Sequence, residues 1–182
     1  MADKNYTYIH TMNRITDSKF PMQKYDAEQK KFVDVLDKDG NTIPMKQVSV
    51  SPKQMETLGH AIEKGGDDGI GKQYAQFSVP AYNVTDWKDK NGKLVTTKPD
   101  ENGNTRQGFQ VRLDADKDVY IQISEITGKG ENGKNVYDYK KNPKIKVSVA
   151  DIEKAFALPD KDKEQAAEAE AETPEAEAPE LD

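Results

Sequence analysis

The sequence predicts a mainly β protein: a small barrel or sandwich of about eight short strands, with two short helices and an acidic C-terminal tail. Three observations predict this class. Short runs of alternating apolar and polar residues are separated by Asp-Gly or Asn-Gly turns, which are typical of antiparallel hairpins. Two other segments carry helix-capping patterns. Only 34% of the 182 residues are hydrophobic, and the composition changes abruptly near position 160.

The turns place the strands in order along the chain. Asp39-Gly40 separates FVDVL from TIPMKQVSV, and Asn91-Gly92 separates KQYAQFSVPAYNVTDW from LVTTK. The runs GFQVRLD and DVYIQISEIT follow, joined by a short turn, and VYDYKK and KIKVSV come after the glycine-rich loop GKGENGKN. Successive residues of a strand point to opposite faces, so each run presents one apolar set to a core.

Two helices interrupt these strands. In SPKQMETLGHAIEKGG, Ser51 is the predicted N-cap, Gln54 completes a capping box, and Gly65 is the predicted end. The second predicted helix, VADIEKAFAL, is capped by Ser148 and has apolar residues at helical spacing.

The C-terminal residues form a segment of a different kind. Residues 160–182 contain ten acidic residues and two lysines, so this segment has a net charge of −8 and leaves +2 on residues 1–159. Pro174 and Pro179 oppose a helix there, and residues that could form a core are missing. We therefore expect one β-rich domain over residues 1–159 and a disordered acidic tail over residues 160–182.

The composition also excludes several kinds of site. The chain has no cysteine, which excludes disulfides, thiolate metal sites and a cysteine nucleophile. No apolar run is long enough to cross a membrane, and the N-terminus lacks the apolar stretch of a signal peptide. These features predict a cytoplasmic protein without membrane contact.

Motifs that resemble ligand sites have simpler explanations. The segment DKDGN (37–41) resembles a calcium loop, but its glycine is at the fourth position rather than the sixth. The segment GKGENG (128–133) matches a dinucleotide-binding pattern, yet a strand-like run follows it where a helix is required. His10 and His60 lack a recognisable third metal ligand. We predict a protein that is not an enzyme and holds no cofactor and no metal.

The outward faces of the strands carry the most informative pattern. Three strands are apolar on one face and have Tyr, Gln, Ser, Arg or Lys on the other. An ordinary solvated face is the alternative, since tyrosine favours strands. Aromatic rings beside cations are typical of surfaces that bind single-stranded nucleic acid, because every base has a π-face and every phosphate a charge. The predicted nucleic-acid-binding residues are Tyr74, Tyr82, Trp87, Arg106, Arg112, Tyr120, Tyr137, Tyr139, Lys140 and Lys141.

This cysteine-free β-rich body with tyrosine-bearing strands and an acidic tail resembles the single-stranded DNA-binding proteins of phages and mobile elements. The resemblance covers the architecture of the whole chain. It implies an OB-like barrel and a role in DNA replication or recombination. It also implies that the acidic tail tunes DNA binding or recruits replication or recombination proteins.

Two functions of different classes therefore fit the sequence. The first is a non-enzymatic, sequence-tolerant single-stranded DNA-binding protein with an acidic regulatory tail. Its binding platform would consist of Tyr74, Tyr82, Arg112 and Tyr120, with the remaining predicted residues beside it. The alternative is a protein-binding inhibitor or adaptor of a phage or mobile element, acting on a host DNA-binding enzyme. The sequence leaves open the oligomeric state, the choice between DNA and RNA, and a place in a virion.

Overall fold

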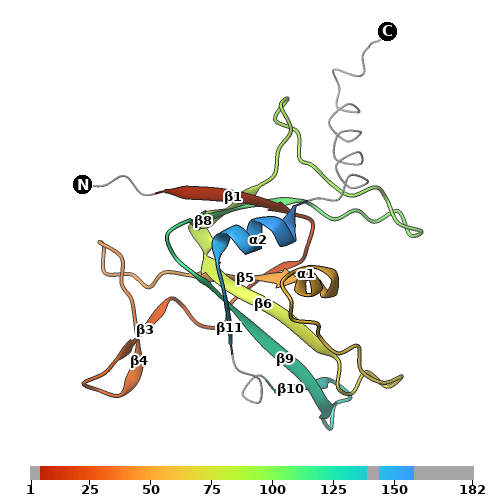
Figure 1. Cartoon of the computed structure of the whole chain (residues 1–182), viewed down its shortest axis with the longest axis horizontal. Coiled ribbons are helices and arrows are strands. Elements are labelled where there is room, and N and C mark those ends of the chain that lie inside the picture. Colours follow the sequence, from red (N-terminus) through yellow and green to blue (C-terminus); the bar gives the residue numbers. More distant parts are fainter. Residues whose placement is uncertain (1–4, 139–143, 158–182) are drawn as a thin grey trace.

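The structure is a computed structural model that describes residues 5–138 and 144–157, and it consists mainly of β-strands (Figure 1). Within these described ranges eleven strands and two α-helices follow one another, so the predicted mainly β class is confirmed. The predicted acidic tail, residues 160–182, lies outside the described residues.

The larger sheet has six strands. Its order is β10-β9-β6-β5-β2, and β11 pairs with β9. All of these pairings are antiparallel. The strands are β2 Ile15–Asp17, β5 Met45–Val50, β6 Gln73–Pro80, β9 Val119–Lys129, β10 Asn135–Asp138 and β11 Ile145–Val147.

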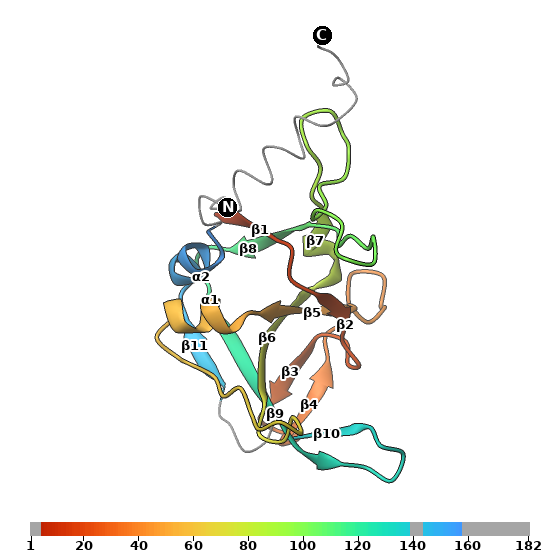
Figure 2. The same ribbon diagram turned by 90° about the vertical axis from the view of Figure 1, so that its right-hand side faces the viewer.

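A smaller sheet of three strands has the order β1-β8-β7. It contains β1 Tyr6–Thr11, β7 Val84–Asp86 and β8 Phe109–Asp114. A separate hairpin, formed by β3 Gln23–Asp26 and β4 Lys31–Asp34, projects from the body of the molecule (Figures 1 and 2).

Three stretches of chain run from one sheet into the other, and the strands curl into a barrel-like arrangement (Figure 2). β1 leads into β2 through residues 12–14, and β6 leads into β7 through a short 3-10 helix, η1 Ala81–Asn83. The third stretch joins β8 to β9 through residues 115–118. Asn13 holds the first bend, because its side-chain amide donates to the Ser49 carbonyl at 2.9 Å and to Gln54 Oε1 at 2.7 Å.

The core lies where the alternation of the strands predicts it. One face of each central strand is buried: Ala75, Phe77 and Val79 on β6, Val111 and Leu113 on β8, and Ile121 and Ile123 on β9. Beyond Ile123 the next buried residue of β9 is Ile126, so the alternation shifts by one residue there. The predicted inward and outward sets of these strands are therefore confirmed up to that point, except that Ala81 and Tyr82, predicted to continue the alternation of β6, lie in η1.

Helix α1, Pro52–Thr57, begins as predicted and ends earlier than predicted. Ser51 and Gln54 form the predicted capping box. Gly59 has a φ of 82°, its N–H donates to the Glu56 carbonyl, and the next N–H donates to the Met55 carbonyl. This pair of bonds is the usual helix termination at a left-handed glycine. The predicted end at Gly65 was wrong.

Helix α2, Val149–Phe156, packs on the same core. The Ser148 hydroxyl accepts a hydrogen bond from the Asp151 N–H at 3.1 Å, as predicted for an N-cap. Phe156 contacts Phe77 edge-on, with ring centroids 6.0 Å apart, and Ile152 is completely buried. Both helices therefore cover the apolar side of the strands and leave the outer face of the larger sheet uncovered.

The turn motifs that resemble ligand sites are hairpin turns, as expected. The Asp37 carboxylate accepts hydrogen bonds from the N–H groups of Asp39 and Asn41, at 2.8 and 3.0 Å. Asp89 and Asp100 make the same contacts in the two later turns. The glycine-rich segment 128–133 lies in the β9–β10 hairpin, where backbone hydrogen bonds close the loop.

Candidate nucleic-acid interface

The outer face of β5, β6 and β9, the central strands of the larger sheet, carries uncharged polar side chains. The register places Gln76 of β6 between Gln122 of β9 and Ser49 of β5, and places Tyr74 beside Ser124. Paired residues of neighbouring strands point to the same face, so these side chains form one surface. We call it the tyrosine face, and its residues are Gln47, Ser49, Tyr74, Gln76, Ser78, Tyr120, Gln122 and Ser124.

The chemistry of the tyrosine face suits a flexible polyanion that has exposed aromatic rings of its own. Tyr74 and Tyr120 are 39% and 55% exposed, so their rings are accessible for stacking. Hydroxyl and amide groups can both donate and accept hydrogen bonds. Among these described outward positions none carries a carboxylate, so the face itself does not repel phosphate.

Cations and a third ring border the tyrosine face. Lys72 Nζ lies 5.0 Å from the centroid of the Tyr74 ring. Tyr137 of β10 packs edge-on against Tyr74, with centroids 6.1 Å apart. Lys146 of β11 is the register partner of Tyr120. The structure therefore brings Tyr74, Tyr120 and Tyr137, three of the predicted site residues, to one side of the larger sheet.

A second group of rings lies on the outer face of the smaller sheet. Arg112 of β8 lies over the Tyr6 ring, with Cζ 4.4 Å from the centroid, and its Nε donates to Asn83 Oδ1 at 3.0 Å. His10 Nε2 lies 3.2 Å from Gln110 Oε1. We call this group the arginine cluster, and its residues are Tyr6, Tyr8, His10, Gln110 and Arg112.

The predicted platform is divided between these two sheets. β8 and β9 are consecutive in the chain, but β8 pairs with β1 and β7, whereas β9 pairs with β6, β10 and β11. Arg112 therefore lies in the arginine cluster, apart from Tyr74 and Tyr120. Tyr82 is 62% exposed in η1, where the chain crosses from one sheet to the other.

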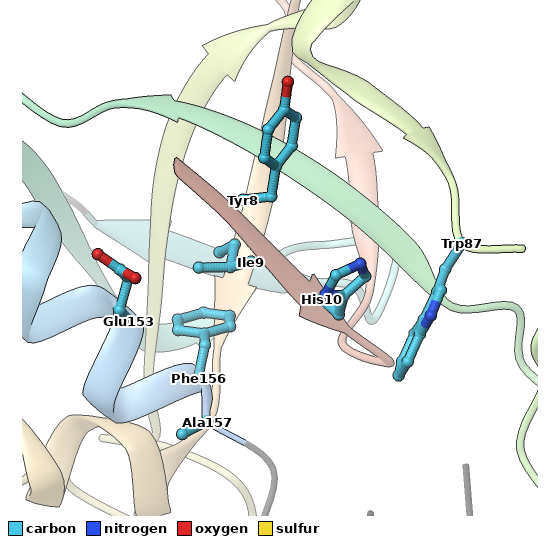
Figure 3. Close-up of a pocket in the computed structure, with 7 residues that line it drawn as sticks. All are labelled: Tyr8, Ile9, His10, Trp87, Glu153, Phe156 and Ala157. Atoms are coloured by element: carbon cyan, nitrogen blue, oxygen red, sulfur yellow. The ribbon is translucent and has the colours of Figure 1, made fainter. Parts of the chain in front are cut away.

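Trp87 packs beside the arginine cluster. Its ring centroid lies 4.8 Å from that of His10, and a methyl group at Gly108 would lie 2.6 Å from the indole. Trp87 also borders an open pocket of about 250 Å³ (Figure 3), which is smaller than most small-molecule sites. The lining residues come mainly from β1 and α2: Tyr8, Ile9, His10, Trp87, Glu153, Phe156 and Ala157.

The remaining predicted residues do not join either group of rings in the described structure. Arg106 has an exposed side chain in the second hairpin after Trp87, which the Thr96–Gln107 bridge closes, and its N–H donates to Thr97 Oγ1 at 2.9 Å. The predicted residues Tyr139, Lys140 and Lys141 lie outside the described residues.

The sequence-based selection missed Tyr6, Tyr8 and His10 as members of a site. Their signal was present in YTYIHT, where alternate positions of one strand carry two tyrosines and a histidine. Tyr6 and Tyr8 are 37% and 50% exposed, which confirms that this face of β1 points outward.

Other kinds of site find no counterpart in the described structure. Within residues 5–138 and 144–157, no group of three or more His, Cys, Asp or Glu side chains could hold a metal ion. None of the helices described is long and apolar enough to cross a membrane. Comparison of the chain with protein-family models, with curated proteins and with solved structures found no match.

Proposed function

We propose that this chain is a sequence-tolerant single-stranded DNA-binding protein that holds the strand on its tyrosine face. The observation that carries the proposal is a broad uncharged sheet face with exposed tyrosines, bordered by lysines. Stacking on such rings accepts every base, and each stacked base contributes about 1–3 kcal/mol.

The rim of the tyrosine face supplies the attraction for phosphate. Lys72 adjoins Tyr74, and Lys146 adjoins Tyr120. Lys146 is only loosely paired, with Asp118 at 4.0 Å, and its side chain is 63% exposed. Cations near stacked bases neutralise the backbone, so binding should weaken as salt rises. Duplex DNA hides its base faces and should therefore bind less tightly than a single strand.

The test compares the two outward faces directly. We expect Tyr120→Ala, and separately Tyr74→Ala, to weaken binding of labelled oligo-dT by about 5- to 150-fold in fluorescence anisotropy. Tyr8→Ala is the matched control, because Tyr8 is 50% exposed on the smaller sheet and Tyr120 is 55% exposed on the larger one. Thermal unfolding should change little for any of these exposed positions.

Further measurements separate the proposal from its alternatives. Emission from Trp87, the only tryptophan, should stay constant when the tyrosine face is saturated. Quenching of Trp87 together with a loss of binding in Tyr8→Ala would move the site to the arginine cluster. If single-stranded DNA, duplex DNA and RNA all fail to bind at about 50 mM salt, the nucleic-acid proposal is wrong. The alternative function, a protein-binding inhibitor or adaptor, is then the remaining candidate.

A further inference from the structure

The β3–β4 hairpin displays rings that the body of the protein does not cover. β3 and β4 make their main contacts with each other. We call residues 19–36 the arm, which includes this hairpin and its flanking residues. Four large apolar side chains are more than half exposed on the arm: Phe20 63%, Tyr25 58%, Phe32 65% and Leu36 56%.

Two of these rings form a pair. Tyr25 and Phe32 are register partners across the hairpin, and they contact each other edge-on with centroids 5.5 Å apart. An isolated two-stranded hairpin is only marginally stable in water. A ring pair across the strands helps to hold such a hairpin together, but it still leaves most of both rings open to a ligand.

The charges of the arm indicate which ligand suits these rings. The arm contains four lysines, Lys19, Lys24, Lys30 and Lys31, and none has an ion-pair partner among the described residues. Two of its three carboxylates are already engaged. Asp26 accepts hydrogen bonds from the turn that follows it, and Asp34 accepts one from Gln23.

Lys24 and Lys31 alternate with Tyr25 and Phe32 along the strands, so they point to the other face of the hairpin. Lysines and exposed rings on one hairpin nevertheless favour nucleic acid over a protein partner. Lysine is depleted in protein–protein interfaces, whereas aromatic residues are enriched there. Single-stranded nucleic acid is bound by both together, because rings stack on bases and cations attract phosphates. The combination on the arm therefore matches a nucleic-acid strand better than another copy of the chain.

The position of the arm is consistent with this ligand. The arm leaves the larger sheet after β2 and returns at β5, whose Gln47 and Ser49 belong to the tyrosine face. Lys46 and Asp17 form an ion pair of 2.8 Å at its base. In both views the arm and β10 lie below β1 and β8, and Figure 1 shows them on opposite sides, the arm at the left and β10 at the right (Figures 1 and 2).

From these observations we infer that the arm is a second contact element for the same nucleic-acid strand. It extends the site beyond the tyrosine face at the β2–β5 edge. This inference rests on the proposed function. It predicts that short oligonucleotides occupy the tyrosine face alone, whereas longer ones also stack on Tyr25 and Phe32.

The test uses oligo-dT of about 8 and about 30 nucleotides with the full chain. The double variant Tyr25→Ala/Phe32→Ala should weaken binding of the longer oligomer by at least about fivefold per ring. Binding of the shorter oligomer should not change. Tyr25→Leu/Phe32→Leu should show the same loss, because leucine keeps the apolar bulk but lacks a π-face. Leu36→Ala is the matched exposed apolar control and should have no effect.

A second measurement tests the lysines. Replacing Lys24, Lys30 and Lys31 with glutamine should reduce the slope of log affinity against log salt by about 2, if each lysine neutralises one phosphate. The longer oligomer should show this change and the shorter one should not.

The outcomes separate the inference from the proposed function. If Tyr120→Ala weakens binding while the arm variants bind both oligomers normally, the arm inference is wrong and the proposed function stands. Wild-type affinity of the Tyr25→Leu/Phe32→Leu variant for the longer oligomer would also overturn the arm inference. So would a change from dimer to monomer in the arm variants, measured by sedimentation equilibrium, without a change in DNA binding. If no oligomer binds the wild-type chain, both proposals fail.

Discussion

At the residue scale, the position of Trp87 depends on a neighbour that has no side chain. A Cβ atom at Gly108 would lie 2.6 Å from the indole and 3.1 Å from the sulfur of Met12. Gly108 is not among the described glycines with positive φ. Its role is therefore to leave space for the indole and the methionine. His10 contacts the same indole, so this packing connects β1, β8 and the chain that follows β7.

Gly108→Ala should therefore displace Trp87. Overpacking of this kind lowers the free energy of unfolding by about 1–3 kcal/mol, which corresponds to a fall of about 2–12 °C in the melting temperature. The emission of Trp87 should shift to longer wavelength as the ring moves toward water. Gly128→Ala is the control, since Gly128 has open space around it and no positive φ. Equal melting temperatures and emission for the two variants would contradict the packing of Trp87.

At the element scale, the sequence patterns of the two helices predicted their first residues better than their last residues. Ser51 and Ser148 cap the two helices as expected, because a cap depends on residues that are adjacent in sequence. The helix ends at Gly59 because this glycine adopts a left-handed conformation, which is a local cause that the prediction overlooked. The path of residues 60–72 after that end depends instead on distant contacts. Gly71 N–H donates to the Ile126 carbonyl of β9, and Gln73 N–H donates to the Glu63 carbonyl. Such distant contacts leave no local signal.

Two glycines near this segment should respond differently to alanine. Gly59 and Gly65 both have positive φ, but a Cβ at Gly59 meets open space, whereas at Gly65 it would lie 2.6 Å from the Lys72 backbone nitrogen. Gly59→Ala should lower the free energy of unfolding by about 1–2 kcal/mol through backbone strain alone. Gly65→Ala should lower it further, because the backbone of Lys72 must also move.

Urea unfolding of the two variants measures this difference. Gly59→Asn provides a third point, and it should be milder than Gly59→Ala because asparagine tolerates left-handed backbone conformations. Equal midpoints for Gly59→Ala and Gly65→Ala would contradict the close approach of Gly65 to the backbone of Lys72.

The difference between local and distant contacts also explains what the sequence could predict of the candidate site. The alternation within a strand identified Tyr74, Tyr120 and Arg112 as outward residues, because alternation is local. The pairing partners of a strand are not local. GFQVRLD and DVYIQIS are joined by a short turn, yet they enter different sheets. Arg112 and Tyr120 consequently face outward on two different sheets, which the alternation alone could not predict.

At the scale of the whole molecule, the net charge of the C-terminal segment differs strongly from that of the rest of the chain. Residues 1–159 carry +2 and residues 160–182 carry −8. A tethered acidic segment is present at high effective concentration near any basic surface of its own chain. It can therefore compete with a nucleic-acid strand for the lysines that border the tyrosine face.

Truncation after Pro159 should tighten single-strand binding, by several-fold at about 50 mM salt. The gain should shrink as salt rises, because the tail and the DNA use the same attraction to lysine. A chain whose tail carboxylates are replaced by amides is the length-matched control and should behave like the truncated chain. Anisotropy measured across a salt series checks both. Unchanged affinity at every salt concentration would mean that the tail affects solubility and not DNA binding.

The long-range pairing of β1 has a consequence for the order of folding. His10 on β1 and its partner Gln110 on β8 are 100 positions apart. A ribosome adding about 5–20 residues per second needs about 5–20 seconds to make that interval. Closing so long a loop is entropically slow. β1 is therefore expected to be among the last strands to dock, and a nascent chain stalled before β8 would leave Ile9, which is buried in the fold, open to aggregation.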